Sequence, residues 1–353
     1  MDSTKERNYN IDFLRGIAAL SIVLIHTAWW LGESYTPLAF RNLCLFVDVP
    51  VFLFLAGYSF NYSGSIIRNL KGILTQWLKW ILFLLFYFLI MFLFFREDLH
   101  INEMLYWLGF KFPTSQPFPI VNGSMWFMYM YIKVSFVGSI IIVLLKKYAS
   151  ANYIQSYLIC MLFCLMLFII CSTVGDMLFF DSQLAFYLLI YMIGYLSNDY
   201  KAKNFWQFLL YEVILLLITI VVFRVCKINI TNIQYIKWTL QIPYLCFALH
   251  SIILFWYLKD TLKVKKGNII NYIGKNAIYF YYSQGIACSL SYFIIEFYSD
   301  YGFPLKFLIT LAFNLFVTVI IAMISIIFYD LLSKLLGKMN FSFLVPCKKQ
   351  ESR

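Results

Sequence analysis

The chain of 353 residues has few charged residues, only three histidines and no recognisable metal or nucleotide motif. Asp, Glu, Lys and Arg make up 13% of it, against about 25% in soluble domains, and 62% of the residues are hydrophobic. No P-loop, dinucleotide glycine motif, serine elbow or zinc signature occurs, and the eight cysteines form no CxxC pair. An ordinary soluble enzyme is excluded, and we expect no metal. We attribute the net charge of +11 to membrane topology and expect no nucleic-acid partner.

Long apolar runs are the dominant feature and predict an all-α, polytopic integral membrane protein. We expect residues 1–353 to form a single membrane domain in contact with the lipid bilayer. Runs of about 17–25 apolar residues are long enough to cross a bilayer as helices. No small-x-small cleavage site follows the first run, so we expect it to stay as a span. About ten transmembrane helices are predicted, near residues 12–31, 43–60, 75–95, 125–145, 153–173, 182–198, 206–223, 238–257, 277–297 and 304–332.

The distribution of positive charge predicts the orientation of these spans. Ten spans place both termini on one side of the membrane. Of the 28 Lys and Arg residues, 19 fall in segments on that side and seven in segments on the other, while Arg15 and Lys133 lie within spans. Because Lys and Arg accumulate in cytoplasmic loops, we expect the N- and C-termini to be cytoplasmic.

The first span carries three polar side chains on one helix face. Arg15 and His26 are eleven positions apart, which is about three helical turns and about 16 Å along the axis. Asp12, three positions before Arg15, lies near the helix start. Arg15 suits the phosphates of an anionic cofactor, or a pair with Asp12 that reaches the membrane interface. His26 suits a general base, or a hydrogen bond to a neighbouring helix.

Further polar and aromatic candidates lie in the second and fourth spans. Asp48 begins the second span, where it can orient the His26 imidazole or accept hydrogen bonds from the backbone of a helix start. Lys133 shares a helix face with Trp126 and can contact a polar substrate or form a structural ion pair. Trp126 opens the fourth span at the outer surface, where an interfacial aromatic belt is the alternative to substrate contact.

At these residues the chain resembles the acyltransferase-3 family of bacterial membrane O-acyltransferases. Arg15 and His26 are similar to the family's motif of an arginine, ten residues and a histidine. Residues 48–58 are similar to its Phe-rich second motif, the pair 126–127 to its third, and residues 273–279 to its fourth. The motifs occur in the family's order, and the likeness covers nearly the whole chain.

The chain departs from the family's pattern at two positions. Gln284 stands where the fourth motif commonly ends in His, which shifts the weight of catalysis onto His26. Ala56 stands where the second motif usually has Ser, which alters packing or one hydrogen bond. We assign Gln284, together with Trp126 and Lys133, to substrate binding.

The resemblance implies a multi-pass enzyme of the bacterial plasma membrane. It would move an acyl group, most often acetyl, from cytoplasmic acyl-CoA (acetyl-CoA) to a hydroxyl of a surface polysaccharide or its lipid-linked precursor. The resemblance also implies that Arg15 helps to bind the cofactor and that His26 carries the chemistry, by direct transfer or through an acyl-enzyme. From their positions near these two residues, we assign Asp12 to cofactor binding and Asp48 to catalysis.

Several alternatives stay open from the sequence. One is a transporter of glycans or lipid-linked sugars that transfers no acyl group. Another is a succinyltransferase of the same family. A homo-oligomer and glycan-assembly proteins stay open as further partners.

Overall fold

The structure, a computed structural model, describes residues 7–32, 34–63, 66–98, 106–107, 118–148, 153–174, 181–202 and 204–338. The regular elements among these residues are all helices, which confirms the predicted all-α class. They are α1 (Tyr9–Trp30), α2 (Leu38–Cys44), α3 (Val49–Ser63), α4 (Ile66–Phe94), α6 (Pro119–Tyr148), α7 (Tyr153–Val174), α8 (Ser182–Leu196), α9 (Phe205–Val225), α10 (Ile233–Trp238), α11 (Ile242–Thr261), α12 (Ile269–Lys275), α13 (Ala277–Leu290) and α14 (Phe303–Lys338), with the 3₁₀ turns η1 (Arg96–Asp98), η3 (Ile230–Asn232), η4 (Ser291–Phe293) and η5 (Ile295–Tyr298).

Within the described part, eight helical segments are long and apolar enough to cross a membrane, so the protein is a polytopic membrane protein. Each of the ten predicted spans contains a helix, but three of these helices, α3, α8 and α13, are shorter than predicted. Helix α8 has 15 residues, and α13 ends at Leu290, after 14 residues, where η4 begins. The predicted second span is interrupted before α3, whose first turn contains Pro50, a residue suited to a helix start.

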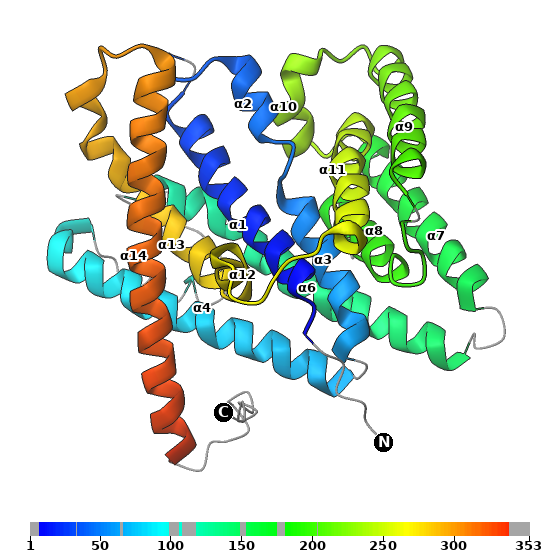
Figure 1. Cartoon of the computed structure of the whole chain (residues 1–353), viewed down its shortest axis with the longest axis horizontal. Coiled ribbons are helices and arrows are strands. Elements are labelled where there is room, and N and C mark those ends of the chain that lie inside the picture. Colours follow the sequence, from blue (N-terminus) through cyan, green and yellow to red (C-terminus); the bar gives the residue numbers. More distant parts are fainter. Residues whose placement is uncertain are drawn as a thin grey trace.

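Helix α1 runs through the middle of the bundle and contacts α2, α3, α11, α12, α13 and α14. In its most apolar stretch 61% of the residues are buried, against 17% for the peripheral helix α9. The start of α1 and the end of α14 point to the same side in Figure 1, the side that the positive charges predict to be cytoplasmic. The polar residues of α1 are therefore enclosed by other helices.

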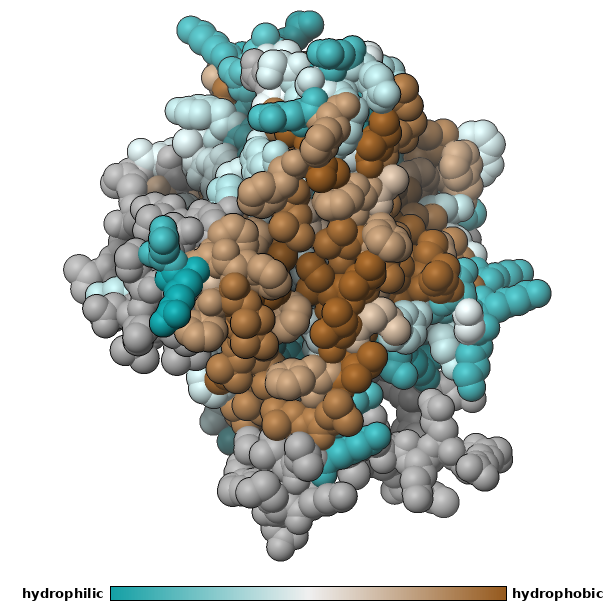
Figure 2. Space-filling view, turned by 90° about the vertical axis from the view of Figure 1, so that its left-hand side faces the viewer, coloured by the Kyte–Doolittle hydropathy of each residue, from teal (hydrophilic) through white to brown (hydrophobic). Residues whose placement is uncertain are grey.

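Exposed hydrophobic side chains form an apolar surface on the bundle. Figure 2 shows a broad apolar band between polar groups at the two ends of the molecule. On α14 the exposed side chains include Leu308, Phe316 and Ile327, each 56–64% exposed. A surface of this kind suits contact with lipid tails. Soluble proteins rarely expose so large an apolar area.

The backbones of α1 and α12 touch where glycine faces glycine. A side chain at Gly274 would overlap the backbone of Asp12, and one at Gly16 would overlap the backbone of Ile270. Small residues allow membrane helices to approach this closely. The contact brings α12, and the start of α13 that follows it, beside Arg15.

Candidate functional site

A cavity of about 160 Å³, here called the inner cavity, opens beside the start of α13. Arg15, Lys79 and Lys275 line it, and each is a cation. Ala277, the first residue of α13, also lines it. Because a helix N-terminus carries partial positive charge, the helix end and the three cations favour an anionic ligand. The remaining lining residues are Phe52, Ala56, Gln76, Phe127, Met128, Tyr131, Gly274, Ile278 and Tyr281.

Polar neighbours hold Arg15 at the wall of this cavity. One guanidinium nitrogen donates a hydrogen bond of 2.6 Å to Ser59, and the other lies 3.8 Å from Asp12. Asp12 is buried, also pairs with Arg7, and does not line the cavity. Asp12 thus contacts Arg15 from behind, so any part it has in cofactor binding acts through the arginine.

A second cavity of about 260 Å³, here called the outer cavity, is lined by His26 and by residues from α3, α6, α10 and α13. Four tryptophans line it, namely Trp29, Trp30, Trp126 and Trp238. Its polar lining residues besides His26 are Asp48, Ser124, Gln234 and Lys237. The cavity therefore combines aromatic faces with a small set of hydrogen-bonding groups.

Gln284 fixes the orientation of His26. The amide oxygen of Gln284 lies 2.5 Å from His26 Nδ1, and Gln284 is fully buried. With the Gln284 amide in this orientation its oxygen can only accept, so Nδ1 of a neutral imidazole carries the proton and Nε2 keeps a lone pair. No described residue forms a hydrogen bond with Nε2. The geometry leaves Nε2 as the basic atom of a residue that lines the outer cavity.

The contacts of Asp48 match the second of its two hypotheses, hydrogen bonding to the backbone at a helix start, and its assignment to catalysis stays a prediction. Its carboxylate lies 2.6 Å from Lys237 Nζ and accepts hydrogen bonds from Tyr244 and from the backbone N–H of Val49. Among the described residues, Gln284 and not Asp48 is the hydrogen-bond partner of the His26 ring. Asp48 therefore anchors Lys237. Lys237 is one of the seven cations in the predicted outer segments, and no spacing in the sequence links it to Asp48.

Trp126 and Lys133 share a helix face but not an environment. Trp126 lines the outer cavity, with its ring 5.7 Å from that of Trp238. Lys133 lines neither cavity and pairs at 2.8 Å with Asp181, which caps α8 by accepting from the Leu184 N–H. The contacts of Lys133 match the structural ion pair, and its assignment to substrate binding stays a prediction.

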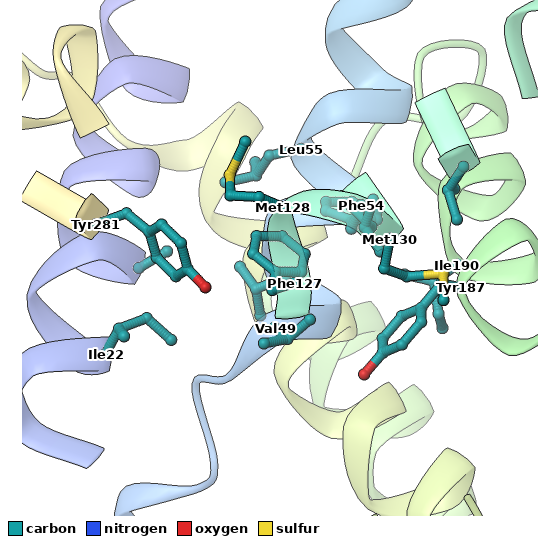
Figure 3. Packing of buried hydrophobic residues seen from close by; sticks show 14 of the residues in the cluster. Ile22, Val49, Phe54, Leu55, Phe127, Met128, Met130, Tyr187, Ile190 and Tyr281 are labelled. Atoms are coloured by element: carbon teal, nitrogen blue, oxygen red, sulfur yellow. The ribbon is translucent and has the colours of Figure 1, made fainter. Parts of the chain in front are cut away.

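The two cavities meet at a pair of aromatic rings. Phe127 on α6 and Tyr281 on α13 line both cavities, and their ring centroids lie 5.6 Å apart, edge to face. The Tyr281 hydroxyl donates to the backbone oxygen of Ser124. Figure 3 shows Tyr281 directed toward Phe127. These rings form a thin partition between a cationic compartment and the compartment that His26 lines.

The second described histidine is placed quite differently. His250 lies between α9 and α11, with Nδ1 2.6 Å from Glu212 and Nε2 3.0 Å from the Thr219 hydroxyl. Both ring nitrogens are engaged, so this residue holds the two helices together. Among the described residues, no group of three or more His, Cys, Asp or Glu side chains is arranged to hold a metal ion.

Comparison with known protein families shows that both cavities lie within a region that matches one family. A family model described as an acyltransferase domain matches residues 8–328, which include both cavities. The chain belongs to the acyltransferase-3 family. No protein of curated function and no solved structure matches it. As a member of this family the protein is a multi-pass membrane acyltransferase.

Proposed function

We propose that this acyltransferase moves an acyl group, most often acetyl, from acyl-CoA to a hydroxyl of a bacterial surface polysaccharide or its lipid-linked precursor, in the plasma membrane. The observation that carries the proposal is the meeting of a cationic inner cavity with an aromatic outer cavity at Phe127 and Tyr281, with His26 on the outer side. The donor occupies the first cavity and the acceptor the second.

The inner cavity supplies what a CoA thioester needs. Arg15, Lys79 and Lys275 are placed to bind its phosphates, and the guanidinium fork of Arg15 suits them best. The cavity, at 160 Å³, is smaller than the roughly 300–1,000 Å³ of pockets that enclose whole ligands. It therefore admits the thin pantetheine arm and leaves the nucleotide at the predicted cytoplasmic entrance. The arm must pass the Phe127–Tyr281 partition to bring the thioester to His26.

The outer cavity supplies what a sugar acceptor needs. Its four tryptophans offer flat apolar faces for sugar rings. The indole N–H of Trp29 donates to the backbone oxygen of Arg41, whereas the N–H groups of the other three can donate hydrogen bonds at the ring edge. Ser124 and Gln234 provide polar groups of the kind that fix a ligand in such a pocket. A glycan acceptor fits this combination, whereas a purely aliphatic acceptor would leave the polar groups without partners.

The chemistry follows from the state of His26. Its Nε2 takes the proton of the acceptor hydroxyl, and the hydroxyl oxygen attacks the thioester carbonyl carbon. The C–S bond then breaks, the electron pair stays on sulfur, and His26 returns the proton to give free CoA thiol and an ester. Gln284 keeps the imidazole in the required tautomer throughout. An acyl-imidazole intermediate on Nε2 is the two-step variant, which ping-pong kinetics would reveal.

The test uses membranes that contain the protein, radiolabelled acetyl-CoA and the host's glycan fraction. Wild type is compared with His26→Gln and with the matched control His250→Gln, which makes the same exchange at the structural histidine. Loss of a general base lowers transfer about 10²- to 10⁴-fold, so His26→Gln should lose nearly all base-labile label in glycan. His250→Gln should keep most of it.

Competition with other acyl-CoAs separates the donors, since a succinyltransferase would lose label to succinyl-CoA more readily than to acetyl-CoA. If wild type transferred no acyl group but moved glycan across the membrane, the protein would be the transporter and the proposal would be wrong. Transfer that survives His26→Gln would remove His26 from the mechanism.

A further inference from the structure

Lys237 is a buried cation in the wall of the outer cavity. Its side chain is 8% exposed, and its ammonium nitrogen lies 2.6 Å from the Asp48 carboxylate. Both charged groups line the same cavity as His26. Among the described residues that line this cavity, Lys237 is the one cation.

The ion pair with Asp48 does not exhaust the donors of Lys237. An ammonium has three N–H groups, and Asp48 accepts from it on one side. The ring of Trp238 lies 5.7 Å from the ammonium. Burial between Asp48 and this ring limits the movement of the long side chain, so its remaining N–H groups are pre-oriented with respect to the cavity that it lines.

During acyl transfer beside His26, negative charge develops on the thioester carbonyl oxygen. Among the described residues that line the outer cavity, those other than Lys237 do not neutralise it. Attack on a thioester moves the carbonyl electron pair onto oxygen, and donors already aimed at that oxygen lower the barrier most. His26 carries the acceptor's proton at that moment and faces the attacking oxygen. Asp48 is an anion and repels the developing charge.

We propose that Lys237 stabilises this oxyanion by donating a hydrogen bond to the thioester carbonyl oxygen during transfer. The inference rests on the proposed function. Lys237 keeps its proton throughout: the acceptor's proton moves to His26 Nε2 and then to the departing sulfur, while the oxyanion collapses to the ester carbonyl. Asp48 acts as a positioning residue that holds the ammonium.

The experiment measures kcat and KM for acetyl-CoA and for glycan with Lys237→Met, Lys237→Arg and the double variant Asp48→Asn/Lys237→Met. Loss of an oxyanion donor lowers kcat about 10²- to 10³-fold. We expect this fall for Lys237→Met with both KM values within about twofold, and partial recovery for Lys237→Arg. The double variant should stay slow, because it removes the unpaired buried carboxylate without restoring a donor.

Lys259→Met is the matched control, since Lys259 is also buried, lies 2.6 Å from Asp260 and lines neither cavity. It should keep the wild-type kcat. Recovery of kcat in the double variant would show that the Lys237–Asp48 pair is merely structural and would overturn the proposal. A rise in glycan KM with kcat unchanged would assign Lys237 to acceptor binding and overturn it too. Wild type that transfers no acyl group would remove the proposed function as well.

Discussion

Replacing Gln284 by Leu tests how His26 is kept in its reactive form. The substitution keeps the volume of the side chain and removes the oxygen that lies 2.5 Å from His26 Nδ1. A buried N–H left without its acceptor costs about 1–3 kcal/mol. The imidazole can escape that cost by moving its proton from Nδ1 to Nε2, since His26 lines the outer cavity with its polar groups.

The tautomer that places the proton on Nε2 has no lone pair for the acceptor's proton. At about 1.4 kcal/mol per factor of ten, a shift of 1–3 kcal/mol lowers the reactive fraction, and hence kcat, about 5- to 150-fold. Because Arg15 and the inner cavity are untouched, KM for acetyl-CoA should stay near its wild-type value.

The assay is steady-state transfer of labelled acetyl groups by Gln284→Leu, Gln284→Asn and wild type at equal amounts of folded protein. The shorter Asn keeps an amide oxygen but retracts it, so its kcat should fall between the other two. An unchanged kcat in Gln284→Leu, with the variant folded, would refute the reasoning that this hydrogen bond selects the tautomer.

Two further predictions concern the partition and the helix packing. Tyr281→Phe removes the hydroxyl that donates to the Ser124 backbone and frees the ring. Hydrolysis of acetyl-CoA without acceptor should therefore rise several-fold. Unchanged hydrolysis would show that this hydroxyl does not control the passage between the two cavities. Gly274→Ala forces α12 away from the Asp12 backbone and should cost about 1–3 kcal/mol, seen as a lower thermal midpoint in detergent. Gly72→Ala, where nothing lies within 4 Å, should keep or raise the midpoint, and equal behaviour of the two variants would contradict the packing argument.

The length of the apolar runs was enough to place a helix in every predicted span, because a membrane helix is defined by its own sequence. The breaks within spans were not visible in these apolar runs. Residues 238–257 were predicted as one span, but α10 ends at Trp238 and a left-handed Leu240 separates it from α11. Such a break is stable only where neighbouring helices satisfy the freed backbone groups.

Helical periodicity alone predicted that Arg15 and His26 share a face of α1. It could not show that they line different cavities, because the two rings that line both cavities, Phe127 and Tyr281, belong to α6 and α13. Nor could it pair His26 with Gln284, which is 258 positions away, or Asp48 with Lys237. Contacts between residues so far apart depend on how the helices pack, and no local pattern in the chain records that packing.

The most direct test of the central claim is the amount of base-labile acetyl label that wild type and His26→Gln transfer to glycan at matched protein levels. Label with wild type and nearly none with His26→Gln is the result that this account predicts. Equal labelling by the two proteins would contradict it, because the meeting of the two cavities at His26 would then have no part in the chemistry.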